Sequence, residues 1–237
     1  MGMKSIQWLV QNLLAPIQCV VCRRVWQYLC SIHAAYLLAY PDSCWICQTP
    51  THNAQCCLEH YEYSPLQWVL IGFYYTRIVQ YMVHKSKYSW AYALLSYFWS
   101  ALSLVVMTNK ILAQAIISKR LIVSYIPMHR RKEYYHRWYN QAYRLASYIA
   151  AELWVPCIKL AEKKRYTFSQ VTKWRSARQK TPSWNYKILS WDIPDDVVIL
   201  LVDDIITTWS TLSAVATCLQ EKYRTNPIRW LCIARNK

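Results

Sequence analysis

Uncharged stretches rich in β-branched and aliphatic residues recur along the chain and predict the strands of a sheet. The clearest are residues 121–126 and 197–202, and residues 228–234 form a similar run with a single charge at Arg229. Residues 64–76 predict a strand or hairpin, and residues 155–160 a short strand. The run that ends at residue 202 lacks the alternation of a half-exposed strand, which is typical of a parallel sheet buried on both faces.

Helical periodicity separates these runs, so the predicted fold class is α/β. It extends from about Ala91 to Ser118, from Asn140 to Leu153 and from Leu212 to Leu219. The middle helix carries its small and aliphatic side chains on one face, at Ala142, Leu145, Ala146, Ile149 and Ala150. Residues 162–187 are basic and polar without periodicity, and we expect a mobile loop or lid there.

Residues 90–107 are uncharged throughout, and 18 residues is the lower limit for a membrane span. The stretch contains three serines and continues into an amphipathic segment that ends at Lys119 and Arg120. We interpret it as a buried core helix, with a membrane helix as the alternative. Residues 1–10 have a single Lys and no small-residue cleavage site, so no cleavable signal is predicted and a cytoplasmic location is expected.

The strand predicted at residues 197–202 ends in two carboxylates, Asp203 and Asp204. A loop rich in hydroxyl groups follows, and a helix begins directly after it; the loop residues are Thr207, Thr208, Trp209, Ser210 and Thr211. Backbone N–H groups, the helix dipole and hydroxyl donors together favour a bound phosphate. The carboxylates suit ribose hydroxyls or Mg²⁺. An ordinary strand-to-helix turn without a ligand is the alternative.

A basic loop, residues 128–132, directly follows the strand at 121–126 and contains His129, Arg130 and Arg131. An open α/β sheet binds its ligands at the carboxyl ends of its strands, so this loop is placed to meet a pyrophosphate. A solvated basic turn is the alternative. The formal net charge of +16 over 237 residues also favours polyanionic partners such as nucleotides, pyrophosphate or nucleic acid.

Cysteines are concentrated near the N-terminus, with seven of the ten between residues 19 and 57. They form four pairs with the spacing of metal knuckles, namely Cys19 with Cys22, Cys30 with His33, Cys44 with Cys47, and Cys57 with His60. Two such pairs complete a tetrahedral zinc site, so eight ligands predict two zinc ions, although the spacing does not say which pairs combine. Full Cys/His coordination leaves no place for a reacting water, which favours a structural role. Cys56 is an alternative ligand to Cys57, and disulfides are the alternative to metal.

The chain is poor in glycine and rich in tryptophan, with 2 Gly and 13 Trp. Ordinary usage of about 7% Gly would give roughly 16. Several tryptophans also stand where a turn favours glycine; Trp154 follows a predicted helix end, and Trp184 and Trp191 lie in a polar, proline-punctuated stretch. We hypothesise that most of these positions are glycines encoded by UGA and read as Trp. A genuinely Trp-rich protein is the alternative, and it would expose large apolar surfaces.

Residues 200–212 resemble the signature for phosphoribosyl pyrophosphate (PRPP) in type I phosphoribosyltransferases, in which a hydrophobic strand, Asp-Asp, two residues and Thr-Thr-Gly-Ser/Thr-Thr follow one another. Trp209 stands at the glycine of that signature. Glycine lets the backbone close around the phosphate, whereas an indole would block the site or bend the loop away.

Nearly the whole chain resembles the ComF family, in which an N-terminal zinc-knuckle module precedes a phosphoribosyltransferase-like domain. The shared pieces occur in the family's order: the Cys-x-x-Cys pairs, then residues 85–88, 126–131, 137–142, 166–170, 201–211 and 232–235. At Trp138 and Trp209 the family has Gly, and at His33 and His60 it has Cys. The resemblance implies a zinc-knuckle module over residues 1–62 and a type I phosphoribosyltransferase-like domain over residues 63–237.

The resemblance also implies a role in DNA uptake during competence and a site for PRPP with Mg²⁺. In that site Asp203 and Asp204 hold the ribose, the hydroxyl loop holds the 5′-phosphate, and residues 129–131 face the pyrophosphate. The second hypothesis is an accessory that binds single-stranded DNA or a competence helicase, with basic residues among Tyr134, Tyr135, Tyr139 and Tyr143. The third is a catalytically inactive scaffold, which is favoured if Trp209 is genuine.

Overall fold

The structure is a computed structural model that describes residues 18–25, 27–62, 64, 66–88, 91–128, 139–164, 185–206 and 209–236. For residues 88, 91, 92, 209 and 210 it describes the backbone alone. The strands are β1 (Val69–Tyr74), β2 (Leu121–Tyr125), β3 (Ala161–Lys163), β4 (Tyr186–Ile188), β5 (Val198–Ile206) and β6 (Ile228–Arg235). The helices are α2 (Ser31–Ala34), α3 (Leu58–Tyr61), α4 (Arg77–Tyr88), the 3-10 helix η1 (Ala91–Leu95), α5 (Ser96–Thr108), α6 (Lys110–Ile117), α8 (Gln141–Glu152) and α9 (Trp209–Lys222).

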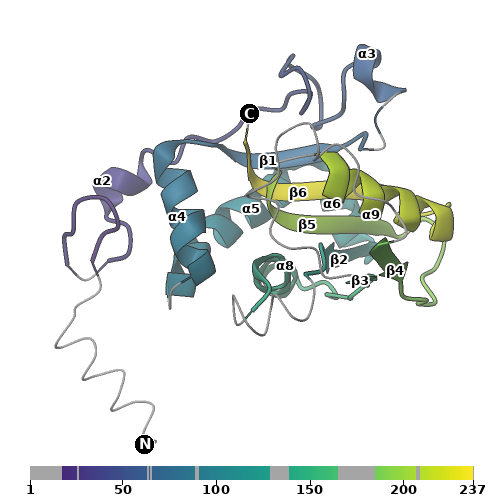
Figure 1. Cartoon of the computed structure of the whole chain (residues 1–237). Helices are drawn as coiled ribbons and strands as arrows, with labels where there is room; N and C mark the ends of the chain where they lie inside the picture. The colour runs from purple at the N-terminus through teal and green to yellow at the C-terminus, as the bar shows by residue number, and fades with distance from the viewer. Residues whose placement is uncertain are drawn as a thin grey trace, which may run out of the picture.

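Four strands form a parallel sheet in the order β1-β6-β5-β2, which confirms the predicted α/β class (Figure 1). The two central strands, β5 and β6, are buried along most of their length, as their largely aliphatic sequences predict. Because all four strands run the same way, their carboxyl ends meet at one edge of the sheet. Asp203 and Asp204 lie at this edge.

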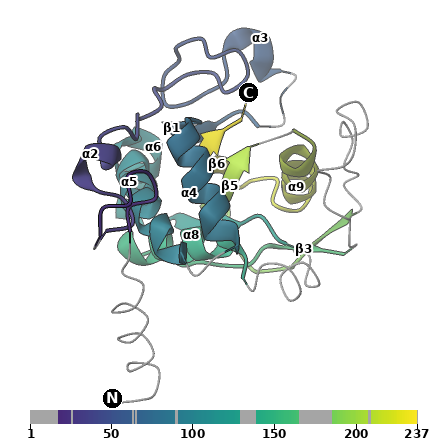
Figure 2. The same ribbon diagram turned by 60° about the vertical axis from the view of Figure 1, so that its left-hand side comes forward.

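Helices cover both faces of the sheet (Figure 2). On one face α4, α5 and α8 pack against it, with Val79, Leu102 and Leu145 in a core that also contains Leu200 of β5. On the other face α9 packs through Val215 and Leu219 against the side chains of alternate strand residues. Successive side chains of each strand therefore enter two separate cores, as the period of two in a strand requires.

The predicted strand at residues 155–160 pairs with β2 at one position only. Cys157 lies opposite Val123 in a parallel bridge, and the backbone N–H of Val123 donates to the Pro156 carbonyl at 2.8 Å. Pro156 has no N–H for a longer ladder. The segment nevertheless lies beside β2 on the side away from β5. After β2 the chain passes through α8 to the segment at residue 157, on one side of β2. It later enters β5, which pairs with β2 on the opposite side.

The predicted helix from Ala91 to Ser118 is broken, because α5 and α6 meet at an angle of 90°. Asn109 has an extended backbone between them, and its side chain accepts a hydrogen bond from the Leu112 N–H at 3.2 Å. Asn caps a helix more readily than it continues one, so the uninterrupted apolar pattern hid the break. Within the described part of the chain, no single helix is long and apolar enough to cross a membrane.

Two basic segments have more regular structure than their composition predicts. The predicted loop at residues 162–187 begins and ends in a short antiparallel hairpin, β3 with β4, while residues 165–184 lie outside the described part. Residues 83–88, which include Lys85 and Lys87, form the last turns of α4. A helical spacing was present there, since the buried side chains of α4 are Val79, Met82, Val83 and Ser86.

Trp154 occupies a backbone conformation that favours glycine. Its φ is +56°, and 94% of its side chain is exposed. Its N–H donates to Ala151, and the N–H of Val155 donates to Ala150, which together form the Schellman motif that ends α8. This is the helix-end position expected from the sequence. In contrast, Trp45 is 1% exposed and donates through Nε1 to the Leu66 carbonyl at 2.9 Å.

We expect Trp154→Gly to stabilise the folded chain by about 1 kcal/mol, because a left-handed backbone costs a residue with a Cβ about that much. The free energy of unfolding in urea measures the change. Trp154→Lys is the control, since it removes the indole and keeps the strained φ, as Lys119 does at the end of α6. Equal gains in the two variants would assign the effect to the exposed indole instead.

The N-terminal region packs directly on the sheet. Ala39 pairs with Phe73 of β1, the Tyr40 N–H donates to the Gly72 carbonyl at 2.9 Å, and the Tyr74 N–H donates to the Leu38 carbonyl at 3.0 Å. The predicted division between residues 62 and 63 falls between α3 and β1. The division into a domain of residues 1–62 and a domain of residues 63–237 stays a prediction.

Candidate functional site

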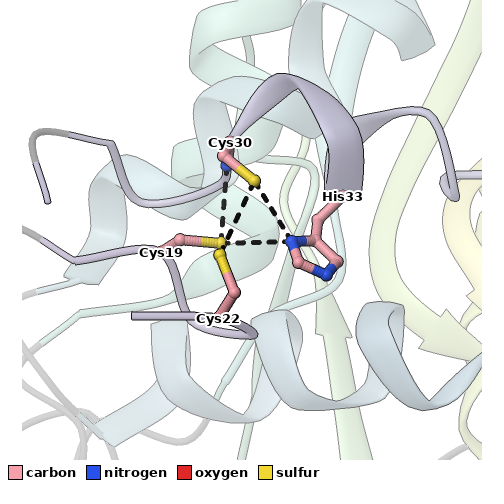
Figure 3. A group of neighbouring side chains, drawn as sticks. All are labelled: Cys19, Cys22, Cys30 and His33. Atoms are coloured by element: carbon pink, nitrogen blue, oxygen red, sulfur yellow. Dashed lines mark hydrogen bonds between the residues drawn. The ribbon is translucent and has the colours of Figure 1, made fainter. Parts of the chain in front are cut away.

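Cys19, Cys22, Cys30 and His33 converge in the first Cys/His cluster (Figure 3). The Cys30 Sγ lies 3.1 Å from the His33 Nδ1, the Cys19 Sγ lies 3.6 Å from the same nitrogen, and the Cys22 and Cys30 sulfurs are 3.8 Å apart. Ligands at about 2.0–2.3 Å from a tetrahedral zinc are separated by roughly 3.3–3.8 Å. The four side chains therefore suit one zinc ion.

Cys44, Cys47, Cys57 and His60 form the second cluster in the same way. The Cys57 Sγ lies 3.0 Å from the His60 Nδ1, and the Cys47 and Cys57 sulfurs are 3.6 Å apart. In each cluster all ligand atoms lie within 4.8 Å of one another. The structure thus brings together all eight predicted ligands and pairs the knuckles in sequence order, which the spacing alone left open.

The two clusters are built on one local plan. A Cys-x-x-Cys turn is followed by a residue with positive φ, Arg23 at +60° and Gln48 at +66°. The third cysteine then caps a one-turn helix, α2 or α3, whose third residue is the histidine. A cysteine at the cap and a histidine three residues later lie on the same side of one turn, so both would reach a single ion.

Each cluster contains a thiol whose pKa is lowered to about 6. At Cys19, burial opposes ionisation, but hydrogen bonds from the backbone of Cys22 and Cys30 outweigh it. At Cys47 the cause is hydrogen bonding from Thr49, first through its side chain and then through its backbone. Thiolates are the form that binds zinc, so these two thiols favour the ligand state, whereas burial raises the pKa of Cys57 to about 11.

Cys56 lies outside both clusters. It is 5% exposed, and its thiol donates to the Leu66 carbonyl at 3.2 Å. Burial raises its pKa to about 12, which keeps it protonated. Cys57, whose Sγ lies 3.0 Å from the His60 Nδ1, is the cysteine that the geometry places in the cluster.

The acidic pair lies where the sheet changes its winding. The segment around Cys157 lies on one side of β2 and β5 on the other, while α8 and α9 cover opposite faces. Doubly wound sheets bind ligands at such a switch point, outside the carboxyl ends of the strands. Residues 203 and 204 are the only carboxylates in the described part of β5.

Asp204 is directed toward α4 and α8. Its Oδ2 lies 2.8 Å from the Lys87 Nζ, and its Oδ1 accepts the Ile205 N–H at 2.7 Å. With its amide oriented to satisfy both neighbours, Gln141 donates to the same Oδ2 at 3.0 Å and accepts from the Ser86 hydroxyl at 2.6 Å. Asp204 is thus held by one cation and one amide from two helices.

Asp203 has a less favourable environment for its charge. Burial, and next the neighbouring negative charge of Asp204, raise its pKa well above the ordinary value of 3.8. Its Oδ1 accepts the Asp204 N–H at 2.8 Å. Tyr186 of β4, which is 4% exposed, lies near this carboxylate: burial, with a contribution from the negative charge of Asp203, raises the Tyr186 pKa to about 12. A carboxylate whose charged form is disfavoured in this way is typical of a functional position.

We expect Asp203→Asn to stabilise the ligand-free chain by about 1 kcal/mol at pH 8, and by much less at pH 3.5. The raised pKa means that the folded state holds its proton more tightly. Asp203 therefore lowers stability progressively as the pH rises from 3.8 to its native pKa, and Asn removes this loss while keeping the acceptor oxygen. Melting temperatures against pH measure it, with Asp192→Asn as the exposed control. A variant less stable than the parent at pH 8 would contradict the expectation.

The predicted phosphate loop is described in part. Thr207 and Thr208 lie outside the described residues, and Trp209 and Ser210 begin α9 with their backbones alone described. Thr211 is half-buried in the first turn of this 14-residue helix. His129, Arg130 and Arg131 also lie outside the described residues. The helix N-terminus directly after the acidic strand is therefore present, and the basic loop is not described.

Sequence reasoning gave no role to three residues that face the acidic pair. Lys87 and Gln141 stood within motifs quoted for the ComF resemblance, but nothing in their spacing placed them against Asp204. Tyr75 follows β1 at the same edge; burial raises its pKa, with opposing effects from Lys87 and Asp204 nearby. These contacts depend on the packing of α4 and α8 against β5, which a linear pattern does not encode.

No protein-family model and no curated protein matches the chain. Among solved structures, an adenine phosphoribosyltransferase is similar over 56% of this chain and 75% of its own, with 14% identity and a TM-score of 0.32. A purine phosphoribosyltransferase from Pyrococcus horikoshii Ot3 is similar over 52% and 82%, with 14% identity and a TM-score of 0.29. Because both TM-scores lie below 0.5, the function of the chain is inferred from its own strand order and side chains.

Proposed function

We propose that the chain binds PRPP, or a closely related phosphoribosyl compound, together with Mg²⁺ at the carboxyl edge of the sheet. The observation that carries this proposal is the acidic pair at the end of β5, at the switch point and directly before the N-terminus of α9. Carboxylates bind ribose hydroxyls and Mg²⁺, and a helix N-terminus favours a phosphate. The ribose and the 5′-phosphate of a phosphoribosyl ligand would thus meet the carboxylates and the helix N-terminus, in that order along the chain.

Within this proposal, Asp203 and Asp204 hold the ribose, and residues 207–211 hold the 5′-phosphate. His129, Arg130 and Arg131 face the pyrophosphate, because they follow β2 at the same edge. Mg²⁺ would supply charge neutralisation for the departing pyrophosphate when bound. If transfer occurs, a site that stabilises negative charge on the leaving group favours an oxocarbenium-like sugar.

The two Cys/His clusters suit structural zinc. They pack against the cores that support the sheet, since Cys19 and Cys30 belong to the core under α4 and α5, and Cys44 to the core under α9. We propose two zinc ions per chain in a module of the ComF type, and a role for the protein in DNA uptake.

Calorimetric titration with Mg·PRPP, with each variant placed in the Trp209→Gly chain, tests the proposed function. Asp203→Asn/Asp204→Asn should abolish binding, because it removes both carboxylates that meet the ribose and metal. Asp195→Asn/Asp196→Asn is the matched control, since this second acidic pair precedes β5 at the opposite edge and interacts with Thr225 and Arg120. Equal affinities of the two double variants would contradict the proposal.

Binding of single-stranded DNA is a second candidate, favoured by the net charge of +16. Of the proposed tyrosine stripe, Tyr139 donates to the Ser86 carbonyl and is engaged in packing, whereas Tyr143 is 45% exposed on α8. A salt-dependent affinity for DNA that survives the Asp203/Asp204 double substitution would establish a surface separate from the PRPP site. A chain that binds zinc but neither ligand would be a scaffold.

A further inference from the structure

Lys87 and Asp204 form a partly shielded ion pair at the carboxyl edge of the sheet. Their charged atoms are 2.8 Å apart, and the exposed fractions of the two side chains are 19% and 17%. At such exposure the pair is stronger than a surface salt bridge, because water screens it less. The ammonium therefore neutralises one of the two carboxylates of the acidic pair.

The backbone of Lys87 is fixed by its neighbours. Ser86 is fully buried, and its carbonyl accepts the hydroxyl of Tyr139, just before α8. The Lys87 N–H donates to the Gln141 side chain at 3.3 Å, and Gln141 is itself 2% exposed. The last turn of α4 is thus tied to the start of α8. The lysine side chain alone, with four flexible carbons, is free to change its contact.

The position of this ammonium conflicts with the proposed ligand. The Oδ2 of Asp204 is already occupied by the Lys87 Nζ and the Gln141 amide, whereas the proposed function needs Asp204 for a ribose hydroxyl or a metal ion. A divalent cation that approaches Asp204 meets a positive charge already in place. The same positive charge is favourable once a pyrophosphate is present.

We propose that Lys87 is a ligand-binding residue that serves as the resident cation of Asp204 in the ligand-free chain. It leaves Asp204 when metal and PRPP bind together, and then pairs with a phosphate oxygen of the ligand. This inference rests on the proposed function. It predicts that the metal alone binds weakly and that metal and PRPP strengthen each other's binding, because only the ligand offers Lys87 a new partner.

Two titrations test the inference, with Mn²⁺ alone and with Mg·PRPP. Lys87→Met should bind Mn²⁺ about tenfold more tightly than the parent chain, because the competing charge is gone. The same variant should bind Mg·PRPP at least tenfold more weakly, because the phosphate loses a cation. Lys87→Arg should remain close to the parent for Mn²⁺. Lys85→Met is the matched control, since Lys85 is exposed on the same helix, with its Nζ 5.5 Å from the Tyr81 ring centroid.

Opposite shifts for the two ligands in Lys87→Met, absent in Lys85→Met, support the inference. If the parent chain binds Mg·PRPP but Lys87→Met and Lys85→Met have identical affinities for both ligands, the inference is overturned and the proposed function stands. Absence of Mg·PRPP binding both in the parent chain and in the Trp209→Gly variant overturns both. Zinc content and the melting temperature verify folding, and Lys87→Gln provides the same test if Lys87→Met does not fold.

Discussion

Replacing Cys44 with Ser should reduce the zinc content from two ions per chain to one and destabilise the chain by at least about 4 kcal/mol. Cys44 is fully buried, with an exposed fraction of 0%, and belongs both to the second cluster and to the core under α9. Losing this ligand removes the ion and leaves three polar ligands near an apolar core. Metal analysis of the purified chain and its unfolding in urea measure the two effects.

Cys56→Ser is the control for this prediction, because Cys56 is also buried but belongs to neither cluster. It should retain two zinc ions and lose no more than about 1–2 kcal/mol, the cost of a polar change at a site with one hydrogen-bond partner. Two zinc ions in Cys44→Ser, or one in Cys56→Ser, would contradict the assigned ligands.

Replacing Trp209 with Gly should increase the affinity for Mg·PRPP by at least about a hundredfold, equivalent to about 2.7 kcal/mol. Residue 209 is the first residue of α9, where backbone N–H groups meet the phosphate of the proposed ligand. Glycine permits close approach of the phosphate, and an indole does not. Calorimetric titration of the two chains measures the difference. Trp154→Gly is the control for the same substitution at the far end of α8.

The codon at position 209 decides which of these two chains the organism makes. UGA at positions 209 and 138 would support decoding as glycine and make the chain with glycine at these positions the native protein. UGG would make the indole genuine and favour the scaffold hypothesis. The left-handed backbone at Trp154 supports glycine at that position, because φ of +56° is costly for tryptophan.

The sheet was predictable because each central strand is built on a short, largely aliphatic run, and β5 and β6 are buried on both faces as such runs require. The break at Asn109 was hidden because the residues on both sides of it are apolar, and only the hydrogen bond to Leu112 shows the cap. The helix α4 was overlooked because its lysines dominated the composition, although Val79, Met82 and Val83 had helical spacing.

The eight residues of the two Cys/His clusters were predictable from local spacing, whereas their pairing was not. Each knuckle and each cap-plus-histidine pair is set by a few consecutive residues, so the sequence contains it directly. The combination of pairs depends on how residues 23–29 and 48–56 fold back, and the two loops differ in length. Lys87 shows the same limit at the acidic edge, because its contact with Asp204 joins residues far apart in the chain.

Hydrogen–deuterium exchange of the Trp209→Gly variant, with and without Mg·PRPP, most directly tests whether the carboxyl edge of the sheet is a phosphoribosyl site. We predict slower exchange in peptides that cover residues 203–216, because the ligand engages the end of β5 and the first turns of α9, and no change in residues 18–62. Unchanged exchange over residues 203–216 at saturating ligand would contradict the proposed site.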